Sequence, residues 1–276
     1  MINIIKFNLW AFYLTLTNRW LAPAEVARSY NAAAPTYDAE WSVLLASVTF
    51  SMLEQLPRIV PDGDWVDLGC GTGLITMKLP PNSVGVDTSS AMLSIAAKRC
   101  PDSFFVREDM LKYLRKQPGT SLSGIVSGWA IEYSNPGDII AESSRVLRKN
   151  GILAFIVSCD NTMTPVFETF DRCLHLYPEI RRLAPWPHFP KDRDSLVNYL
   201  EENGFDPLWQ EDGEIPIEPP DGRPLNLEWL LKTGVLAGFD QMFPHHEWNR
   251  VHMDFNRLLG DNPVKHRYFA GVFRKR

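Results

Sequence analysis

The stretch Asp67-Leu68-Gly69-Cys70-Gly71-Thr72-Gly73 decides the fold of this 276-residue chain. It follows a β-rich run at residues 64–68 and leads into a helical pattern at residues 73–79. Glycine suits such a turn because a side chain would keep a ligand away from the backbone, and because glycine adopts backbone dihedrals that other residues avoid. In open α/β sheets, ligands bind beyond the carboxyl ends of the strands. The stretch therefore predicts a ligand-binding loop between a first strand and the helix after it.

Downstream of this loop, short β-rich runs alternate with helical patterns. The other strands are expected at residues 83–87, 103–106, 124–127, 152–158, 205–210 and 267–274, with helices at 89–99, 136–148 and 194–203. The continuous apolar run at residues 152–158 is typical of a strand buried on both faces. This alternation predicts a Rossmann-like α/β fold with a seven-stranded, mostly parallel sheet and helices on both faces.

Three stretches fall outside the alternation, namely residues 1–57, about 160–192 and about 218–263. We expect an N-terminal helical lid or docking segment at residues 1–57, and a domain at residues 58–276 that carries the two later stretches as helical insertions. All three stretches are rich in aromatic residues and proline. Long connections inside a compact domain are often functional lids, although an enlarged core or a dimer interface would account for the same composition.

Composition limits the classes of partner. The formal net charge of −5 argues against a nucleic-acid binder, which normally carries a basic patch. The four cysteines are far apart and form no CxxC pair, so the sequence predicts neither a zinc site nor a disulfide framework. A reducing cytoplasm is the simplest location for such a chain. No compact cluster of metal ligands is expected.

The first sixteen residues are unusually apolar and aromatic. The basic n-region and small-residue cleavage site of a signal peptide are not present in them. The run is also too short to span a bilayer and is broken by Lys6 and Asn8. We expect a helix that docks on the domain or mediates a homodimer contact, and attachment to a membrane surface is the alternative.

The glycine spacing and the acids near the loop limit which class of ligand the loop can bind. Dinucleotide enzymes use G-x-G-x-x-G and hold a pyrophosphate there, whereas this chain has G-x-G-x-G with Asp67 at its entry. That carboxylate would repel a pyrophosphate but tolerates a cofactor that bears an ammonium and a sulfonium. Asp87 ends the second strand, where it can accept hydrogen bonds from the ribose hydroxyls of any nucleoside. Asp109 and Met110 follow the third strand, where they can serve an adenine amino group and ring face.

Four segments in the right order resemble motifs of class I S-adenosylmethionine-dependent methyltransferases. They are residues 66–73, residues 85–89 with 92–99, residues 108–110, and residues 145–153. The likeness covers roughly residues 60–158 and, more loosely, residues 196–205. One departure is the start of the fourth strand, Leu122-Ser123-Gly124-Ile125, where family members often have an aspartate. The departure makes the residues around the methyl acceptor harder to align.

The resemblance implies S-adenosylmethionine as the cofactor. It places the glycine loop under the methionine part, Asp87 on the ribose and Asp109 on the adenine amino group. The predicted cofactor-binding residues are Tyr37, Asp67, Gly69, Gly71, Gly73, Asp87, Thr88, Asp109, Met110 and Ser127.

Upstream, Tyr30-Asn31-x-x-Ala34-x-x-Tyr37-Asp38 is similar to the entrance segment of quinone, sterol and other small-molecule methyltransferases. In that group the segment implies a helical lid with an aromatic hydroxyl near the reacting centre. Tyr37 could instead only pack on the domain.

Residues around the acceptor are expected where the fourth strand ends, beside the sulfonium. Glu132 could act as a base or stabilise a developing cation, although a solvent-facing loop acid is an equal alternative. His246 lies in the last insertion and could serve as a base, or simply lie on the surface. The predicted catalytic residues are Glu132, Tyr37 and His246, and the predicted substrate-binding residues are Trp129, Tyr133, Tyr30 and Trp186.

The abundance of aromatic residues favours a flat, apolar acceptor in a lidded pocket. The sequence therefore predicts an enzyme that transfers a methyl group to carbon or oxygen of an aromatic or prenyl-derived small molecule, as in natural product biosynthesis. The alternative is an inactive S-adenosylmethionine-binding sensor or partner subunit.

Overall fold

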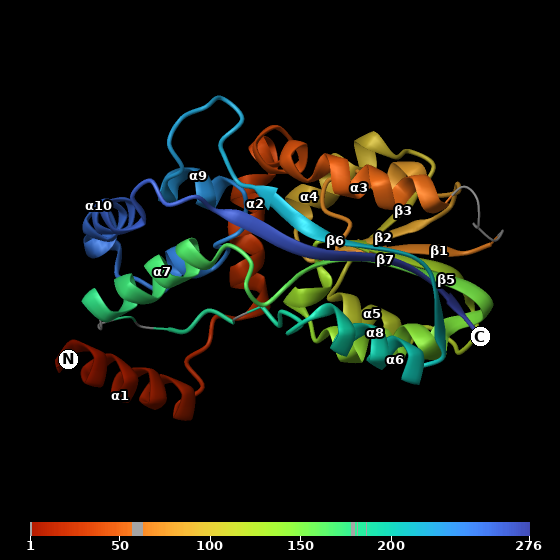
Figure 1. Cartoon of the computed structure of the whole chain (residues 1–276), viewed down its shortest axis with the longest axis horizontal. Helices are drawn as coiled ribbons and strands as arrows, with labels where there is room; N and C mark the ends of the chain where they lie inside the picture. The colour runs from red at the N-terminus through yellow and green to blue at the C-terminus, as the bar shows by residue number, and fades with distance from the viewer. Residues whose placement is uncertain (1, 57–62, 178–179, 181, 186) are drawn as a thin grey trace. The chain divides into compact units, whose positions relative to one another are not determined.

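The computed structural model describes residues 2–56, 63–177, 180, 182–185 and 187–276 (Figure 1). The chain divides into two compact units. We call Leu45–Thr162, Pro187–Ile215 and His266–Arg276 the sheet unit, and Met1–Leu44, Met163–Trp186 and Pro216–Lys265 the helical unit. Each unit is built from segments that lie far apart in the sequence.

A seven-stranded sheet forms the centre of the sheet unit, in the order β3-β2-β1-β4-β5-β7-β6. Neighbouring strands from β3 to β5 pair in parallel, and β7 pairs antiparallel with β5. The bounds are β1 Trp65–Leu68, β2 Val84–Asp87, β3 Phe104–Arg107, β4 Leu122–Gly128, β5 Leu147–Ser158, β6 Phe205–Pro216 and β7 Lys265–Lys275. The predicted Rossmann-like, mostly parallel seven-stranded sheet is confirmed.

Helices cover both faces of this sheet, because alternate residues of each strand point to opposite sides. The helices of the unit are α3 Val43–Gln55, α4 Ser90–Arg99, α5 Met110–Lys116, α6 Pro136–Val146 and α8 Arg193–Glu202. Leu153, Phe155 and Val157 of β5 belong to one core, with side chains from α5, α6 and α8. Ile152, Ala154 and Ile156 belong to the other, with side chains from α3.

Side-chain caps begin several of these helices, as their sequences favour. The Ser89 hydroxyl accepts from the Met92 N–H at 3.2 Å and so caps α4. The helix expected at residues 73–79 was wrong, because only a short 3₁₀ turn forms, at Thr76–Lys78. The chain there closes i→i−3 bonds and then meets Pro80, which cannot donate to a continuing helix.

The helical unit contains α1 Ile2–Leu16, α2 Pro23–Tyr37, α7 Thr164–Leu176, α9 Leu227–Lys232 and α10 Trp248–Leu259. Within it, α10 and α1 both pack on α7, and α2 packs on α9. Glu40 joins two segments of this unit, because its carboxylate accepts from Arg223 at 2.8 Å and from the Trp229 indole at 2.7 Å. Within the described ranges, none of the helices has the length and apolar character needed to cross a membrane.

Candidate cofactor and acceptor site

The glycine loop leaves β1 with three glycines in the left-handed region, at φ values of 69° for Gly69, 51° for Gly71 and 83° for Gly73. A Cβ on Gly69 would stand 2.4 Å from the Ala130 Cβ, so this position has no room for a side chain. A Cβ on Gly71 would meet no described heavy atom within 4 Å. The loop is therefore tightly packed at Gly69 and open at Gly71, as a cradle for a ligand requires.

Asp87 links the end of β2 to this open part of the loop. Its Oδ2 accepts from the Gly71 N–H at 3.0 Å, and its Oδ1 accepts from the Ser89 N–H at 2.8 Å. Burial raises the pKa of this carboxyl, and the backbone hydrogen bonds oppose that rise. Each carboxylate oxygen has two lone pairs, so Asp87 keeps acceptor capacity for ligand hydroxyls beside the open face of Gly71.

Asp67 is buried beneath the loop, with 1% of its surface exposed. Its Oδ2 accepts from the Thr76 hydroxyl at 2.6 Å, while Oδ1 has no hydrogen-bond partner among the described residues. Burial, above all, raises the pKa of Asp67 to about 7, against the opposing hydrogen bond from Thr76. An orphaned carboxylate oxygen is costly, and a donor such as a ligand ammonium would satisfy it.

The adenine end of the expected site lies after β3. Asp109 caps α5, since its Oδ1 accepts from the Lys112 N–H at 2.9 Å. The Met110 methyl lies 3.6 Å from the place where a Gly69 Cβ would stand. Met110 therefore lies beside the glycine loop, and contact of Asp109 and Met110 with an adenine stays a prediction.

Two further predicted cofactor residues, Ser127 and Thr88, make hydrogen bonds within the protein. The Ser127 hydroxyl donates to the Leu68 carbonyl at 2.7 Å and is buried, so it joins the end of β4 to the end of β1. The Thr88 carbonyl accepts from Arg107 Nε at 3.1 Å. Direct contact of Ser127 or Thr88 with the cofactor stays a prediction.

Trp129 and Tyr133 stand where β4 ends. Trp129 has a left-handed φ of 59°, and its N–H donates to the Ile156 carbonyl at 2.8 Å. A left-handed tryptophan is strained, and the indole is held by a 3.1 Å bond from Nε1 to the Thr49 hydroxyl. Tyr133 is 45% exposed. Both residues lie at the edge of the sheet where acceptor residues were expected.

Glu132, between them, is 2% exposed, so it is not a solvent-facing loop acid. Its Oε1 accepts from the Ser158 hydroxyl at 2.6 Å and from the Ser158 N–H at 3.3 Å. The same hydroxyl lies 2.9 Å from His266 Nε2. Glu132 Oε2 is buried with no hydrogen-bond partner among the described residues. Burial raises the pKa of Glu132 to about 7 and lowers that of His266 to about 3.

The sequence reasoning found Glu132 but missed Ser158 and His266. Ser158 ends β5 and His266 lies near the start of β7, so the two are distant in sequence but adjacent in the sheet. The signal available was positional, because Ser158 is the last residue of one expected strand, at 152–158, and His266 directly precedes another, at 267–274.

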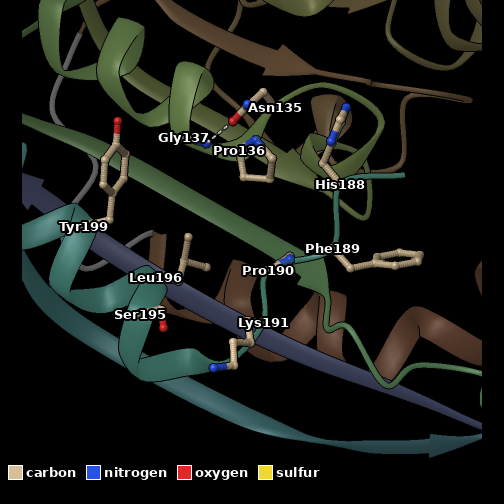
Figure 2. Close-up of a pocket in the computed structure, with 10 residues that line it drawn as sticks. All are labelled: Asn135, Pro136, Gly137, His188, Phe189, Pro190, Lys191, Ser195, Leu196 and Tyr199. Carbon is tan, nitrogen blue, oxygen red and sulfur yellow. Dashed lines mark hydrogen bonds between the residues drawn. The ribbon is translucent and has the colours of Figure 1, made fainter. Parts of the chain in front are cut away.

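A groove of about 350 Å³ is lined by residues of α6, of α8 and of the segment 188–191 (Figure 2). The groove lies between the first turns of α6 and α8, and His188 also lines it. The His188 N–H donates to the Glu132 carbonyl at 2.6 Å, so the groove and the Glu132 turn share a wall. Its lining residues, all of them described, include one lysine and no carboxylate: Asn135, Pro136, Gly137, His188, Phe189, Pro190, Lys191, Ser195, Leu196 and Tyr199.

The remaining predicted site residues belong to the helical unit. Tyr37 ends α2, and the Tyr30 ring lies 2.6 Å from where a Gly234 Cβ would stand. The His246 side chain is 70% exposed. Trp186 lies outside the described residues. The roles of these four in a lid or in catalysis stay predictions. Among the described side chains, no three His, Cys, Asp or Glu residues gather as metal ligands.

Residues 66–155 match the model of a protein family described as a methyltransferase domain. The chain is 31% identical over 160 residues to a probable S-adenosylmethionine-dependent methyltransferase of Saccharomyces cerevisiae, covering 54% of this chain and 50% of that protein. It is 31% identical over 160 residues to a malonyl-[acyl-carrier protein] O-methyltransferase of Alcanivorax borkumensis, covering 55% and 54%. The chain thus spans about half the length of these curated relatives.

Among solved structures, a geranyl diphosphate methyltransferase in complex with S-adenosylmethionine superposes with a TM-score of 0.50 at 16% identity. The superposition covers 84% of this chain and 85% of that one. At this identity the likeness concerns the fold.

Proposed function

Because residues 66–155 match a methyltransferase domain family, we propose that the chain binds S-adenosylmethionine and transfers its methyl group to a small molecule. The observation that carries the proposal is Asp87, whose two oxygens hold Gly71 and Ser89 beside the open face of the glycine loop. Bound S-adenosylmethionine supplies an electrophilic methyl group on a sulfonium.

The chain's own residues fit this cofactor in three places. Asp87 offers acceptors to the ribose hydroxyls, and Gly71 lets the ligand lie against the backbone. Asp67 has an orphaned oxygen for a cationic donor. Asp109 and Met110 offer an acceptor and an apolar cover for the adenine. Together they extend across the ends of β1, β2 and β3, where ligands of open α/β sheets bind.

For the acceptor we propose a flat, apolar molecule, aromatic or prenyl-derived, that is methylated on carbon or oxygen. Trp129 and Tyr133 would wall its site, and Glu132 would take the proton that the acceptor loses. A base with a pKa near 7 suits proton transfer at neutral pH. Tyr30, Tyr37, His246 and Trp186 complete the proposed lid and acceptor contacts, with Tyr37 and His246 in catalytic roles.

Isothermal titration with S-adenosylmethionine and S-adenosylhomocysteine tests the cofactor half. Asp87→Ala is expected to weaken binding at least tenfold, since a hydrogen bond to a charged group contributes about 1.5–3 kcal/mol. Asp102→Asn, at an exposed acid of the same unit, is the matched control and is expected to bind as the wild type does. If the folded wild-type protein binds neither ligand, the proposal is wrong.

Transfer of a labelled methyl group to a panel of acceptors tests the second half. The panel holds phenols, quinols, indoles and prenyl alcohols, together with malonyl thioesters, because one relative is named for a malonyl group. Methylation of the thioesters alone would contradict the acceptor class and leave methyl transfer in place.

We also propose that α1 mediates a homodimer contact. Ile5, Leu9, Phe12 and Leu16 follow one another at spacings of four, three and four residues and are 55%, 66%, 63% and 70% exposed. Such spacing makes the apolar stripe of a helix that pairs with another helix. The helix has one charged residue, Lys6, which is fewer cations than a membrane-surface helix usually carries.

A further inference from the structure

We propose that Arg99 is a positioning residue for cofactor binding, because it holds the glycine loop at Thr72 in the conformation that accepts the ligand. The proposal rests on the proposed binding of S-adenosylmethionine and adds a residue that lies outside the glycine loop. Arg99 is the last residue of α4, and both Arg99 and Thr72 belong to the sheet unit.

The segment after the glycine loop gives the loop limited support of its own. A full helix there would tie the Gly73 end of the loop into a continuous series of i→i−4 hydrogen bonds. In the structure, the Met77 N–H donates to the Gly73 carbonyl at 3.0 Å, but the next two N–H groups close i→i−3 bonds and the chain then reaches Pro80. The second half of the loop therefore depends on contacts with other elements.

The C-terminal end of α4 supplies such contacts. A Cβ on Gly73 would stand 3.1 Å from the Ala96 Cβ and 3.2 Å from the Cys100 Sγ, so the loop lies directly against this end of the helix. The Cys100 thiol also donates to the Gly73 carbonyl at 3.4 Å. This close approach is possible because residue 73 is a glycine.

Arg99 adds a charged donor to the contact between α4 and the loop. Its Nη1 donates to the Thr72 carbonyl at 3.0 Å and to the Thr72 hydroxyl at 3.0 Å. A hydrogen bond from a charged donor is stronger than one between neutral groups. Thr72 is 2% exposed, so little water reaches its two oxygens to compete for these bonds. Arg99 is therefore a firm anchor for the loop.

Two anchors of opposite charge hold neighbouring residues of the loop. Asp87, at the end of β2, accepts from the Gly71 N–H at 3.0 Å, and Arg99, at the end of α4, binds the two oxygens of Thr72. A Cβ on Gly71 would meet no described heavy atom within 4 Å. The stretch that the two anchors hold is therefore the open part of the loop, where the ligand is proposed to bind.

The glycines of the loop explain why such anchors matter for binding. Glycine has more backbone freedom than any other residue, so a loop that contains Gly71 and Gly73 has many conformations to adopt when an anchor is removed. The apparent affinity of a ligand falls in proportion to the fraction of molecules in the binding-competent conformation. Arg99 thus acts on that fraction, rather than through a contact of its own with the ligand.

Binding kinetics distinguish this role from a direct contact. Arg99→Ala should raise the Kd for S-adenosylhomocysteine at least fivefold through slower association, with the dissociation rate within twofold of the wild type, because fewer molecules hold the loop in its binding conformation. Titration calorimetry measures the Kd, and stopped-flow mixing measures the rates. Lys98→Ala removes the same charge at the neighbouring, exposed position and should bind as the wild type does. An unchanged Kd in Arg99→Ala, or a rise carried by faster dissociation, overturns the proposal.

Hydrogen exchange followed by mass spectrometry tests the loop in the absence of ligand. In Arg99→Ala, peptides that cover residues 69–73 should exchange at least fivefold faster than in the wild type, while peptides from β5 should exchange as before. Unchanged exchange in the loop refutes the anchor. Equal acceleration in β5 would show general destabilisation and would also contradict it.

Variants that keep or remove single hydrogen bonds test the contact between Arg99 and Thr72. Thr72→Val keeps the shape of the side chain and removes the hydroxyl, so it should raise the Kd by part of the effect of Arg99→Ala. In the Thr72→Val background, Arg99→Ala should cost less affinity than in the wild type, since one of its two bonds is already absent. Arg99→Lys keeps a charged donor and should restore most of the affinity. Effects of the two substitutions that add in full would contradict the shared contact.

Failure of the proposed function would look different from failure of this inference. A folded wild-type protein that binds neither S-adenosylmethionine nor S-adenosylhomocysteine refutes the proposed function. A wild type that binds S-adenosylhomocysteine no more tightly than Arg99→Ala does refutes the role of Arg99 and leaves the proposed function in place.

Discussion

Replacing Glu132 by glutamine should make the stability of the protein depend less on pH. Glutamine keeps the shape of the side chain and the acceptor for Ser158, but it cannot ionise. The buried carboxyl of the wild type is most stable when protonated, because burial raises its pKa from 4.5 to about 7. Its stabilising effect is therefore fully present below pH 4.5 and is lost as the pH rises through 7.

The size of the effect follows from the rise of about 2.5 in pKa. Each pKa unit corresponds to about 1.4 kcal/mol, so ionisation of Glu132 in the folded state costs about 3 kcal/mol. Most of this cost develops between pH 5 and pH 8. Asp67 also makes the fold less stable as the pH rises, since burial raises its pKa to about 7. His266 makes the fold less stable at acid pH, since burial lowers its pKa to about 3. Both are present in the wild type and the variant, so they largely cancel in the difference.

Urea unfolding at pH 5, 6, 7, 8 and 8.5 measures this difference. Relative to the wild type, Glu132→Gln should gain about 2–3 kcal/mol between the two ends of the series. The unpartnered amide adds a constant offset, so the change with pH is diagnostic and the absolute value is not. Glu202→Gln, at an exposed position of α8, is the control and should show no such change. A difference that stays constant with pH would refute the buried, raised-pKa carboxyl.

Three further predictions concern the loop, the ribose site and α1. Gly69→Ala should destabilise the fold by about 1–3 kcal/mol in urea unfolding, because its left-handed φ and the Ala130 Cβ at 2.4 Å both oppose a side chain, whereas Gly71→Ala should cost less stability and chiefly weaken cofactor binding in titration. Asp87→Ala should raise the Kd for S-adenosylmethionine at least tenfold, and an unchanged Kd would show that Asp87 does not bind the ribose. The double variant Leu9→Glu and Phe12→Glu should abolish concentration-dependent dimerisation in sedimentation velocity, while a wild type that sediments as a monomer throughout would contradict the α1 contact.

The sheet could be predicted from the sequence because its signals are local. Each buried strand is a short apolar run, and Gly69, Gly71 and Gly73 occupy the left-handed positions that such a turn needs. Helix propensity was less reliable after Gly73, where a 3₁₀ turn replaces the expected helix. The order of short strands and turns therefore predicted the fold more reliably than the expected bounds of each helix did.

The residues of the candidate site likewise divide into those that local sequence predicts and those that depend on tertiary contacts. Asp87 was predictable because its place at the end of β2 follows from the strand pattern alone. Ser158 and His266 were not, because their contact is made across 108 positions of sequence by the pairing of β5 with β7. The burial of Glu132 also depends on tertiary packing, and a single acid in a loop gives no sign of it.

The antiparallel direction of β7 explains why these three residues meet. In a parallel sheet, strands end at one edge, and the residues that follow β4 and β5 both emerge there, which places Glu132 near Ser158. A parallel β7 would bring its own last residues to that edge. Because β7 runs the other way, its beginning lies there instead, and His266 reaches Ser158. Any chain with this strand order can therefore add a side chain from its last strand to the edge where the glycine loop lies. In this chain, that side chain is a buried, neutral imidazole.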